Sequence, residues 1–373
     1  MKIALFNDVA YRYASGHPSA VGGAERYQWL MARALAAHGW EAVVAVRSGL
    51  AAGDRVRIDG VDFVGVGTRM YLPTLYRFFS EEKPDWCFWF GSTHWLGPAA
   101  AVAAWAGVGT VFSAQFDLDV RPRQALSEWR SFWRLYAWGL AASRKIFLQH
   151  RGQYLELPEQ WRSKTHVMPG VVSVPASIQP HVARRPYVAW VGVLREPKRP
   201  DRLLEIAREC PAIDFVVCGG TSTHRSPRGY GERIVEALSR APNITYLGHV
   251  EPRRAIDVIG NAALLLSTSD AEGFPSVFVE AWAHGTPVVS LKIDPDRVIE
   301  RHGLGVMTRS TAQAAETIVR LIQSCEERQT IGARARDYAI RTHSPEAVAR
   351  LVEQALHAPS APMPHAFENA AES

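Results

Sequence analysis

Short apolar runs alternate with longer segments of helical period along most of the chain. The apolar runs have the length of buried strands, and the longer segments repeat apolar residues at spacings of three and four. This alternation predicts parallel sheets with helices on both faces. In the first half, the pattern predicts a helix at Glu25–His38 and strands at Lys2–Phe6, Ala42–Val46, Phe63–Val66, Trp86–Phe90, Thr110–Ala114 and, as the last, Lys145–Gln149.

A second cycle of the same pattern follows residues 173–186, a proline-containing stretch that we interpret as a linker. It predicts a helix at Arg199–Glu209 and strands at Tyr187–Val191, Ile213–Cys218, Ile244–Leu247, Ala263–Ser267 and Val288–Ser290. We therefore predict an α/β chain with two Rossmann-like, doubly wound domains, 1–172 and 187–337, facing across a cleft. A helix at about 338–357 is expected to pack back on the first domain, and 358–373 is expected to be a disordered tail.

The amino-acid composition agrees with a two-domain globular protein and limits the classes of molecule that it is expected to bind. The chain has 373 residues, 47% of them hydrophobic and 21% charged. Its net charge of +5 favours anionic small molecules or an anionic membrane surface, and it is too small to indicate nucleic acid. The four cysteines lack metal-site spacing, and Cys87 and Cys218 lie in apolar runs, which is typical of buried thiols in a reducing cytosol. The apolar run at the N-terminus is too short for a signal peptide, and we expect no transmembrane span because no run of 18 apolar residues occurs.

The strongest chemical signal is the segment EGFPSVFVE, in which Glu272 and Glu280 stand eight residues apart. Gly273 and Pro275 let the backbone approach a ligand and start a helix, whose free N–H groups attract negative charge. Two carboxylates in this arrangement suit a sugar ligand, because one carboxylate can accept hydrogen bonds from two hydroxyl groups.

This segment resembles the paired-glutamate motif of family 4 glycosyltransferases, and the likeness continues through EAWAHGTPVVS. The resemblance implies the GT-B fold, a C-terminal domain that binds a nucleotide-sugar donor and an N-terminal acceptor domain. It also implies that Glu272 contacts the donor sugar and that Glu280 holds the ribose hydroxyls. Phe274 and Ser276 belong to the same donor-binding motif.

Other matches follow in the family's order along nearly the whole chain. Gly22 and Gly23 precede a helix, like the family's glycine pair beside the donor phosphates. The segment WVGVLREPKRP resembles the loop in which an arginine and a lysine hold the diphosphate. Here Gly192 and Lys198 keep their positions, the arginine position holds Val193, and Arg195 is a candidate replacement. A further match, the CGG run, adds Gly219 to the expected donor-binding residues.

A second departure concerns a histidine that contacts the donor sugar in the family. The corresponding position, after the strand Thr110–Ala114, holds Gln115. Retaining transfer in this family is thought to need no protein nucleophile, because the leaving phosphate can take the acceptor's proton. Gln115 can supply an amide contact instead, and His94, in the loop GSTHW, is a second candidate for this role.

Two D-x-D patterns, Asp117/Asp119 and Asp294/Asp296, spell the metal-binding motif of another glycosyltransferase fold. The pattern is short enough to arise by coincidence. Metal-dependent transferases use the cation to neutralise the diphosphate. Here lysine, arginine and helix N-termini are expected to do so, and we expect no metal or other cofactor.

The segment 125–140 predicts a basic, tryptophan-rich amphipathic helix. Its apolar positions include Leu126, Trp129, Trp133 and Tyr136, with arginines around them. Such a helix suits a peripheral contact with lipid headgroups. A helix packed on its own sheet, with solvated arginines, explains the pattern equally well.

The sequence thus predicts a cytoplasmic retaining glycosyltransferase, with a possible peripheral position on the inner membrane face. It would move sugar from a nucleotide-diphosphate sugar to a hydroxyl of a glycan, lipid-linked or small-molecule acceptor. Val193 and Gln115 leave open a catalytically weakened nucleotide-sugar-binding or scaffold protein of the same fold. A sugar-nucleotide epimerase would need further acid and base residues. A dehydrogenase is disfavoured because no G-x-G-x-x-G follows the first strand.

Overall fold

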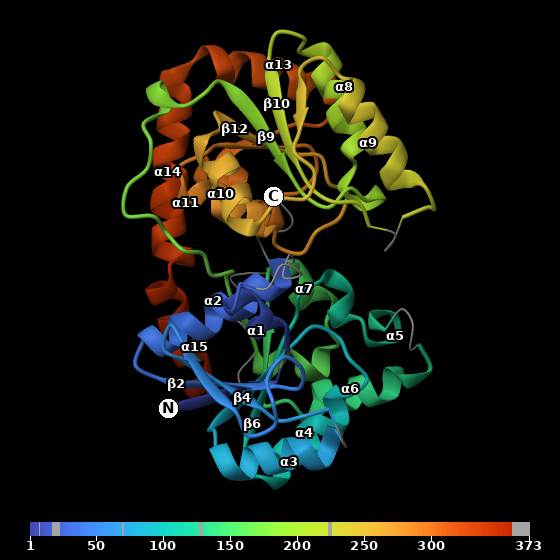
Figure 1. Cartoon of the computed structure of the whole chain (residues 1–373), viewed down its shortest axis with the longest axis vertical. Helices are drawn as coiled ribbons and strands as arrows, with labels where there is room; N and C mark the ends of the chain where they lie inside the picture. Colours follow the sequence, from blue (N-terminus) through green and yellow to red (C-terminus); the bar gives the residue numbers. More distant parts are fainter. Residues whose placement is uncertain (7, 17–22, 69–70, 127–129, 223–225, 360–373) are drawn as a thin grey trace. The chain divides into compact units, whose positions relative to one another are not determined.

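The computed structural model describes residues 1–6, 8–16, 23–68, 71–126, 130–222 and 226–359. The chain divides into two units (Figure 1). Unit 1 consists of Met1–Val171 together with the returning segment Pro345–Ser373, and unit 2 consists of Val172–Ser344. Most of the predicted tail, residues 360–373, lies outside the described residues.

Unit 1 is built on an eight-stranded sheet with the order β3-β4-β2-β1-β5-β6-β7-β8. Every neighbouring pair is parallel except β3 and β4, which form an antiparallel hairpin. The strands are β1 (Lys2–Phe6), β2 (Glu41–Val46), β3 (Arg55–Ile58), β4 (Val61–Gly65), β5 (Trp86–Phe90), β6 (Gly109–Ser113), β7 (Lys145–Leu148) and β8 (Thr165–Val167). The inner strands are almost wholly buried, which explains why their sequences are continuous apolar runs.

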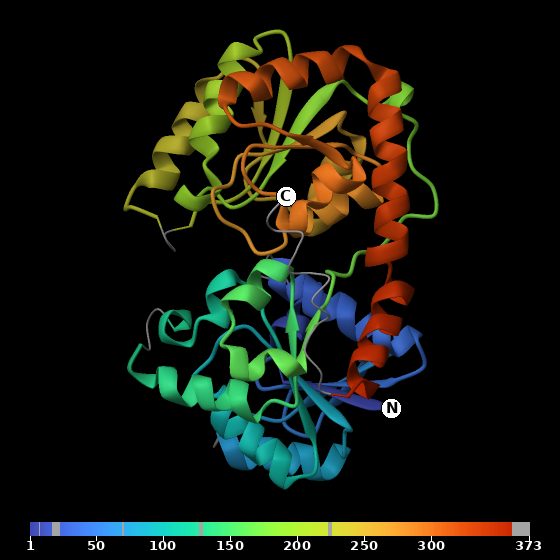
Figure 2. The same ribbon diagram turned by 180° about the vertical axis from the view of Figure 1, so that it is seen from behind.

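Helices cover both faces of this sheet, and each face has its own hydrophobic core. One face carries α1 (Asp8–Ala14), α2 (Gly23–Ala37) and α15 (Pro345–His357), and in both views the red α15 lies beside the blue α2 (Figures 1 and 2). The other face carries α3 (Tyr71–Glu82), α4 (Leu96–Trp105) and α6 (Trp133–Ala142). The short helices α5 (Pro122–Ala125) and α7 (Arg151–Glu156) follow β6 and β7.

Unit 2 contains a six-stranded parallel sheet with the order β11-β10-β9-β12-β13-β14. The strands are β9 (Tyr187–Val191), β10 (Asp214–Cys218), β11 (Ile244–Tyr246), β12 (Leu264–Ser267), β13 (Val288–Ser290) and β14 (Gly305–Met307). The order reverses between β9 and β12, where the chain passes from one half of the sheet to the other. Ligands of open α/β sheets bind at such a switch point, beyond the carboxyl ends of the strands.

The helices of unit 2 also form two layers, visible on either side of the sheet in Figure 1. One layer contains α8 (Pro200–Glu209), α9 (Tyr230–Arg240) and α13 (Thr311–Gln323). The other contains α10 (Pro252–Asn261), α11 (Ser276–Ala283), α12 (Val298–His302) and α14 (Cys325–His343).

Three short edge strands were missing from the sequence-based expectation. The strand β8 follows β7, so Lys145–Gln149 is not the last strand of unit 1, and β3 and β14 are likewise additional. The reason is that edge strands bury few side chains: β3 is largely exposed and carries two arginines, and β8 and β14 have only three residues each. Their sequences therefore lack a distinctive apolar run.

Two predicted helices are broken in the structure. The expected single helix at 125–140 is replaced by α5, a 3-10 turn at Arg130–Phe132 and α6. The cause is Leu126, whose extended backbone ends α5 and whose side chain enters the core. The segment at about 338–357 is the end of α14 followed by α15, and the break falls at Ser344, directly before Pro345.

Cys87, Cys210 and Cys218 are buried as free thiols, which confirms the predicted burial of the two strand cysteines, Cys87 and Cys218. Within the described part of the chain, no helix combines the length and apolarity needed to cross a bilayer.

Candidate functional site

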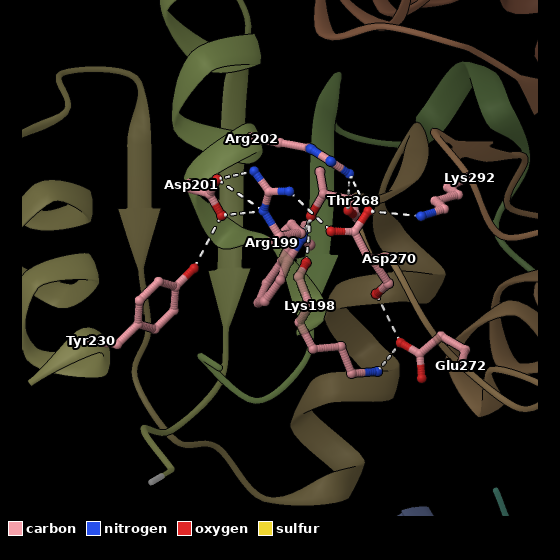
Figure 3. Close-up of polar contacts among 11 residues, drawn as sticks. Lys198, Arg199, Asp201, Arg202, Tyr230, Thr268, Asp270, Glu272 and Lys292 are labelled. Atoms are coloured by element: carbon pink, nitrogen blue, oxygen red, sulfur yellow. Dashed lines mark hydrogen bonds and ion pairs between the residues drawn. The ribbon is translucent and has the colours of Figure 1, made fainter. Parts of the chain in front are cut away.

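The carboxyl ends of β9 and β12 bring Lys198 and Glu272 together in unit 2. The strands are parallel neighbours, so the loops that follow them leave the same edge of the sheet. The Lys198 ammonium forms an ion pair with Glu272 Oε1, and Ser269 Oγ donates to the same oxygen at 2.8 Å (Figure 3). Both charged side chains are mostly buried, with 17% and 11% of their surfaces exposed. The pairing therefore shields the lysine and the first motif glutamate from most of the solvent.

Hydrogen bonds to the backbone fix these two loops against each other. Thr268 Oγ1 donates to the Lys198 carbonyl at 2.8 Å and accepts from Trp190 Nε1 at 2.9 Å. In addition, the Asp270 N–H donates to the Pro197 carbonyl at 2.8 Å. Because Thr268 is fully buried, its two hydrogen bonds are shielded from most of the solvent. The positions of Lys198 and Glu272 thus depend on main-chain geometry as well as on their own ion pair.

Asp270 forms ion pairs with the cationic side chains that lie beside Lys198 and Glu272. Its carboxylate contacts Arg199 at 3.0 Å, Arg202 at 2.8 Å and Lys292 at 3.5 Å (Figure 3). Burial alone would raise the pKa of Asp270, but the hydrogen bonds from Arg199 and Arg202 lower it overall. Arg199 also pairs with Asp201, which accepts a hydrogen bond from Tyr230. The arginines next to Lys198 are therefore engaged by carboxylates of the protein.

The second motif glutamate, Glu280, lies on α11 and is buried, with 7% of its surface exposed. Pro275 occupies the position before the helix and has no side-chain acceptor, so it does not cap the first N–H groups of α11. Phe274 is anchored by ring contacts with Trp282 at 6.1 Å and His343 at 5.5 Å. Gly273 and Pro275 are buried and Ser276 is exposed.

Close backbone approach explains one of the expected glycines. A Cβ atom at Gly219 would lie 1.8 Å from the Gly192 carbonyl oxygen, so only glycine fits where β10 passes the β9 loop. Gly192 itself has room for a Cβ, which would meet the Trp190 ring at 3.4 Å. Gly219 is therefore required for the close packing of its own backbone against the loop that follows β9.

The vacant arginine position and its candidate replacement differ in environment. Val193 is 40% exposed, whereas Arg195 is partly buried and its Nε atom is buried without a hydrogen-bond partner among the described residues. The loop turns back at this point, because the Lys198 N–H donates to the Arg195 carbonyl at 3.0 Å. Arg195 thus carries a buried N–H donor without a partner among the described residues, three residues before Lys198.

In unit 1, Gln115 lies just beyond β6 and is buried. Its amide Nε2 donates to the Ala114 carbonyl at 3.0 Å, and its own N–H donates to Asp119 Oδ2 at 2.7 Å. Asp119 also accepts from the Phe116 N–H at 3.1 Å. Burial raises the pKa of Asp119 despite these bonds. The Asp119 carboxylate thus closes the 3-10 turn at Asp117–Val120. The second aspartate of the Asp117/Asp119 pattern therefore has a structural role.

Asp117 instead pairs with His150 at 2.7 Å, a contact that the sequence reading missed. His94 packs between Trp95 and Phe132, with ring centroids 5.2 and 5.6 Å away. Gly23 begins α2, and Gly22 lies outside the described residues. In the part of the chain that the structure describes, no three His, Cys, Asp or Glu residues gather as metal ligands.

Comparison with family models assigns both units. The model of glycosyl transferases group 1 matches residues 176–338, and that of the glycosyl transferase 4-like domain matches residues 22–170. The chain belongs to glycosyltransferase family 4. Among curated proteins, this family 4 chain is 32% identical over 143 residues to the D-inositol 3-phosphate glycosyltransferase of Mycobacterium tuberculosis. The match covers 37% of the chain and about 30% of the length of that relative.

Solved structures show that the family 4 chain has the GT-B fold. It is similar to Anabaena HepE in complex with UDP and glucose, with a TM-score of 0.71 and 17% identity, over 95% of this chain and 99% of HepE. Sucrose-phosphate synthase from Thermosynechococcus elongatus gives a TM-score of 0.68 and 16% identity over 95% and 98% of the two chains. WaaG, a glycosyltransferase involved in lipopolysaccharide biosynthesis, gives 0.64 and 16% over 96% and 100%.

The Asp270 cluster predicts a measurable contribution to stability. Asp270→Ala leaves Arg199, Arg202 and Lys292 without their shared carboxylate, so the free energy of unfolding at pH 7 should fall by about 1–3 kcal/mol. Because the pKa of Asp270 is lowered in the folded chain, the contribution is present at neutral pH and is lost as the pH falls through that lowered pKa. Urea unfolding of the variant and the parent at several pH values measures the difference.

The matched control is Asp337→Ala, which removes an exposed helical pair with Arg341. Here the loss should stay below about 0.5 kcal/mol. Equal effects of the two substitutions would show that the Asp270 cluster is only a solvated group of charges.

Proposed function

We propose that the chain is a retaining glycosyltransferase, which moves a sugar from a nucleotide-diphosphate sugar to a hydroxyl group of a glycan, lipid-linked or small-molecule acceptor. The observation that carries this proposal is the Lys198–Glu272 pair at the switch point of unit 2. In this pair, a cation that can bind a diphosphate (Lys198) lies beside a carboxylate that can accept hydrogen bonds from sugar hydroxyls (Glu272). Similar folds crystallised with UDP and glucose, or with UDP and glycan ligands, support these substrate classes.

The ion pair suggests how donor binding prepares the site. A diphosphate carries about two negative charges and competes with Glu272 for the Lys198 ammonium. Once Lys198 turns to the phosphate, both Glu272 oxygens can accept hydrogen bonds from the donor sugar. Glu280, on the second turn of α11, is proposed to accept from the ribose hydroxyls. The free N–H groups at the start of α11 add positive potential.

The transfer step needs few protein groups. The bond between the anomeric carbon and the phosphate oxygen breaks, and the acceptor oxygen bonds to the same face of the sugar. The acceptor's proton passes to the leaving diphosphate. Lys198 and the α11 N-terminus stabilise the charge that develops on that diphosphate. We propose that no metal ion takes part, since Asp117 and Asp119 already hold His150 and backbone N–H groups.

Substituting the two motif glutamates tests this proposal. Glu280→Gln should weaken binding of the nucleotide sugar by about 1–3 kcal/mol, through lost charge-assisted hydrogen bonds. Glu272→Gln should mainly lower turnover, with a smaller effect on nucleoside diphosphate affinity. Calorimetry with nucleoside diphosphates and release of nucleoside diphosphate from a panel of donors measure the two effects, in the presence of a chelator.

Glu316→Gln, on the exposed face of α13, is the control and should change neither quantity. Donor binding without any release of nucleoside diphosphate would favour the catalytically weakened or scaffold alternative. A strict, reversible need for manganese or magnesium would contradict the metal-free mechanism.

We further propose that Arg195 replaces the arginine missing at Val193. The support is its buried Nε atom, which has no partner among the described residues and lies on the loop that leads to Lys198. Arg195→Ala should then cost about 1.5–3 kcal/mol of diphosphate binding, and Val193→Arg in that variant should recover part of it. If Arg195→Ala binds like the parent while Lys198→Ala does not, Arg195 has only a structural role.

Finally, we propose a peripheral membrane contact at α6, with part of its apolar surface in the core. Tyr136 and Leu140 are buried, whereas Phe132 and Trp138 are 40% and 47% exposed, and Arg134 contacts the Trp133 ring. Trp129 lies outside the described residues. Exposed aromatic residues on a segment that also carries arginines suit an anionic headgroup layer.

Vesicles that contain phosphatidylglycerol should retain the chain at low salt and release it at high salt, because the Debye length is only about 10 Å at 0.1 M. The double substitution Phe132→Ser and Trp138→Ser should reduce this retention, and Ile340→Ser, an exposed apolar residue of unit 2, should not. Retention that is insensitive to both salt and the double substitution would exclude this surface.

A further inference from the structure

Neighbouring strands of unit 1 bring Asp117 and His150 together at their carboxyl ends. Asp117 follows β6 and begins a 3-10 turn, and His150 follows β7 and directly precedes α7. His150 Nε2 lies 2.7 Å from Asp117 Oδ1. An ionised carboxylate can only accept, so Nε2 carries the hydrogen and donates it. The pair lies at the sheet edge where ligands of α/β domains bind.

A buried glutamine holds the same carboxylate oxygen. Gln153 is fully buried, its Nε2 donates to Asp117 Oδ1 at 3.2 Å, and its Oε1 accepts from the Gln149 N–H at 2.8 Å. Since both polar groups of the amide are used, Gln153 has one orientation. Asp117 is thus fixed by two donors from α7 and the residue before it.

The Asp117 carboxylate is partly exposed to solvent. Its side chain is 40% exposed, and Oδ2 makes no hydrogen bond to any residue that the structure describes. Burial alone would raise the pKa of Asp117, but the hydrogen bond and charge of His150 lower it overall, so the group is ionised at neutral pH. A fixed, charged oxygen with unused acceptor capacity is suited to receive hydroxyl groups.

The sequence leaves space for the imidazole where a larger residue would displace it. A Cβ atom at Gly152 would come within 2.9 Å of His150 Nδ1 and 3.0 Å of its Cε1. Gly152 is the second residue of α7, and glycine is a weaker helix former than alanine. Gly152 therefore gives up helix stability at the position that allows His150 to reach Asp117.

From these contacts we propose that Asp117 binds hydroxyl groups of an uncharged sugar in the acceptor, with His150 and Gln153 as its positioning residues. This inference rests on the proposed function and specifies its acceptor: the part bound at unit 1 bears hydroxyl groups and carries no negative charge there. An acceptor with a carboxylate at this point would be repelled by Asp117. The same carboxylate would receive the hydroxyls of a neutral pyranoside.

Transfer to methyl glucoside, methyl galactoside and methyl glucuronide, with a donor found active in the panel, tests the assignment. Asp117→Asn should raise the KM for the neutral glycosides about tenfold or more, with the Kd for nucleoside diphosphate unchanged. It should also reduce the preference for methyl glucoside over methyl glucuronide, because the repelling charge is gone. A purely structural role would not alter that preference.

Three further variants separate positioning from folding. His150→Phe should raise the acceptor KM, and His150→Gln, which restores an N–H donor, should recover part of the loss. Gly152→Ala should raise the acceptor KM, because its Cβ displaces the His150 imidazole, and the melting temperature of the variant shows whether the fold is retained. Asp59→Asn, in the exposed turn between β3 and β4, is the matched control and should have no effect.

Saturation-transfer NMR of methyl glucoside with the full chain gives a readout that does not need turnover. The parent chain could bind methyl glucoside without transferring any sugar. If Asp117→Asn then loses that binding, the proposed function is contradicted but the assignment of this binding site stands. Sugar transfer with unchanged acceptor KM and preference in Asp117→Asn would overturn the site and leave the proposed function standing.

Discussion

The parallel pairing of β9 with β12 is the constraint on which the donor-side arrangement depends. It places two loops, separated by about 70 residues of chain, at one edge of the sheet. Thr268 then bonds to the Lys198 carbonyl, and the Asp270 N–H bonds to that of Pro197, so the loops are joined through their backbones. Only after this alignment can Lys198 meet Glu272. The site is therefore a property of strand order as much as of the residues that line it.

Charge in this region is largely balanced within the protein. Lys198, Arg199, Arg202 and Lys292 face the carboxylates of Asp201, Asp270 and Glu272, which leaves a net charge of +1. Counting the basic residues in the loop sequence would therefore overestimate the positive charge that is available to a bound phosphate. The ammonium of Lys198 differs from the arginines because the carboxylate it pairs with among the described residues, Glu272, is itself a motif residue with another proposed role.

Buried strands could be predicted from the sequence because each is a continuous apolar run between two covered faces. Edge strands such as β3 could not, since their exposed residues resemble those of loops. For the site, the resemblance to family 4 placed Lys198 and Glu272 in one function, but their direct ion pair depends on which loops the sheet aligns. The Asp117–His150 contact could not be predicted for the same reason: the D-x-D pattern draws attention to Asp117 but not to His150, and only the register of β6 and β7 joins them.

The α15 helix makes unit 1 discontinuous in sequence. Its residues Val348 and Val352 are fully buried in the core that α2 and the first sheet also form. During synthesis, the ribosome must therefore complete all of unit 2 before this part of the unit 1 core can close. Until α15 emerges, the apolar face of unit 1 that α15 covers stays exposed. Unit 2, by contrast, is complete in sequence once residue 344 has emerged. This order reverses the usual N-terminal-first folding of multidomain chains, because the core of unit 1 closes only after α15 has been synthesised.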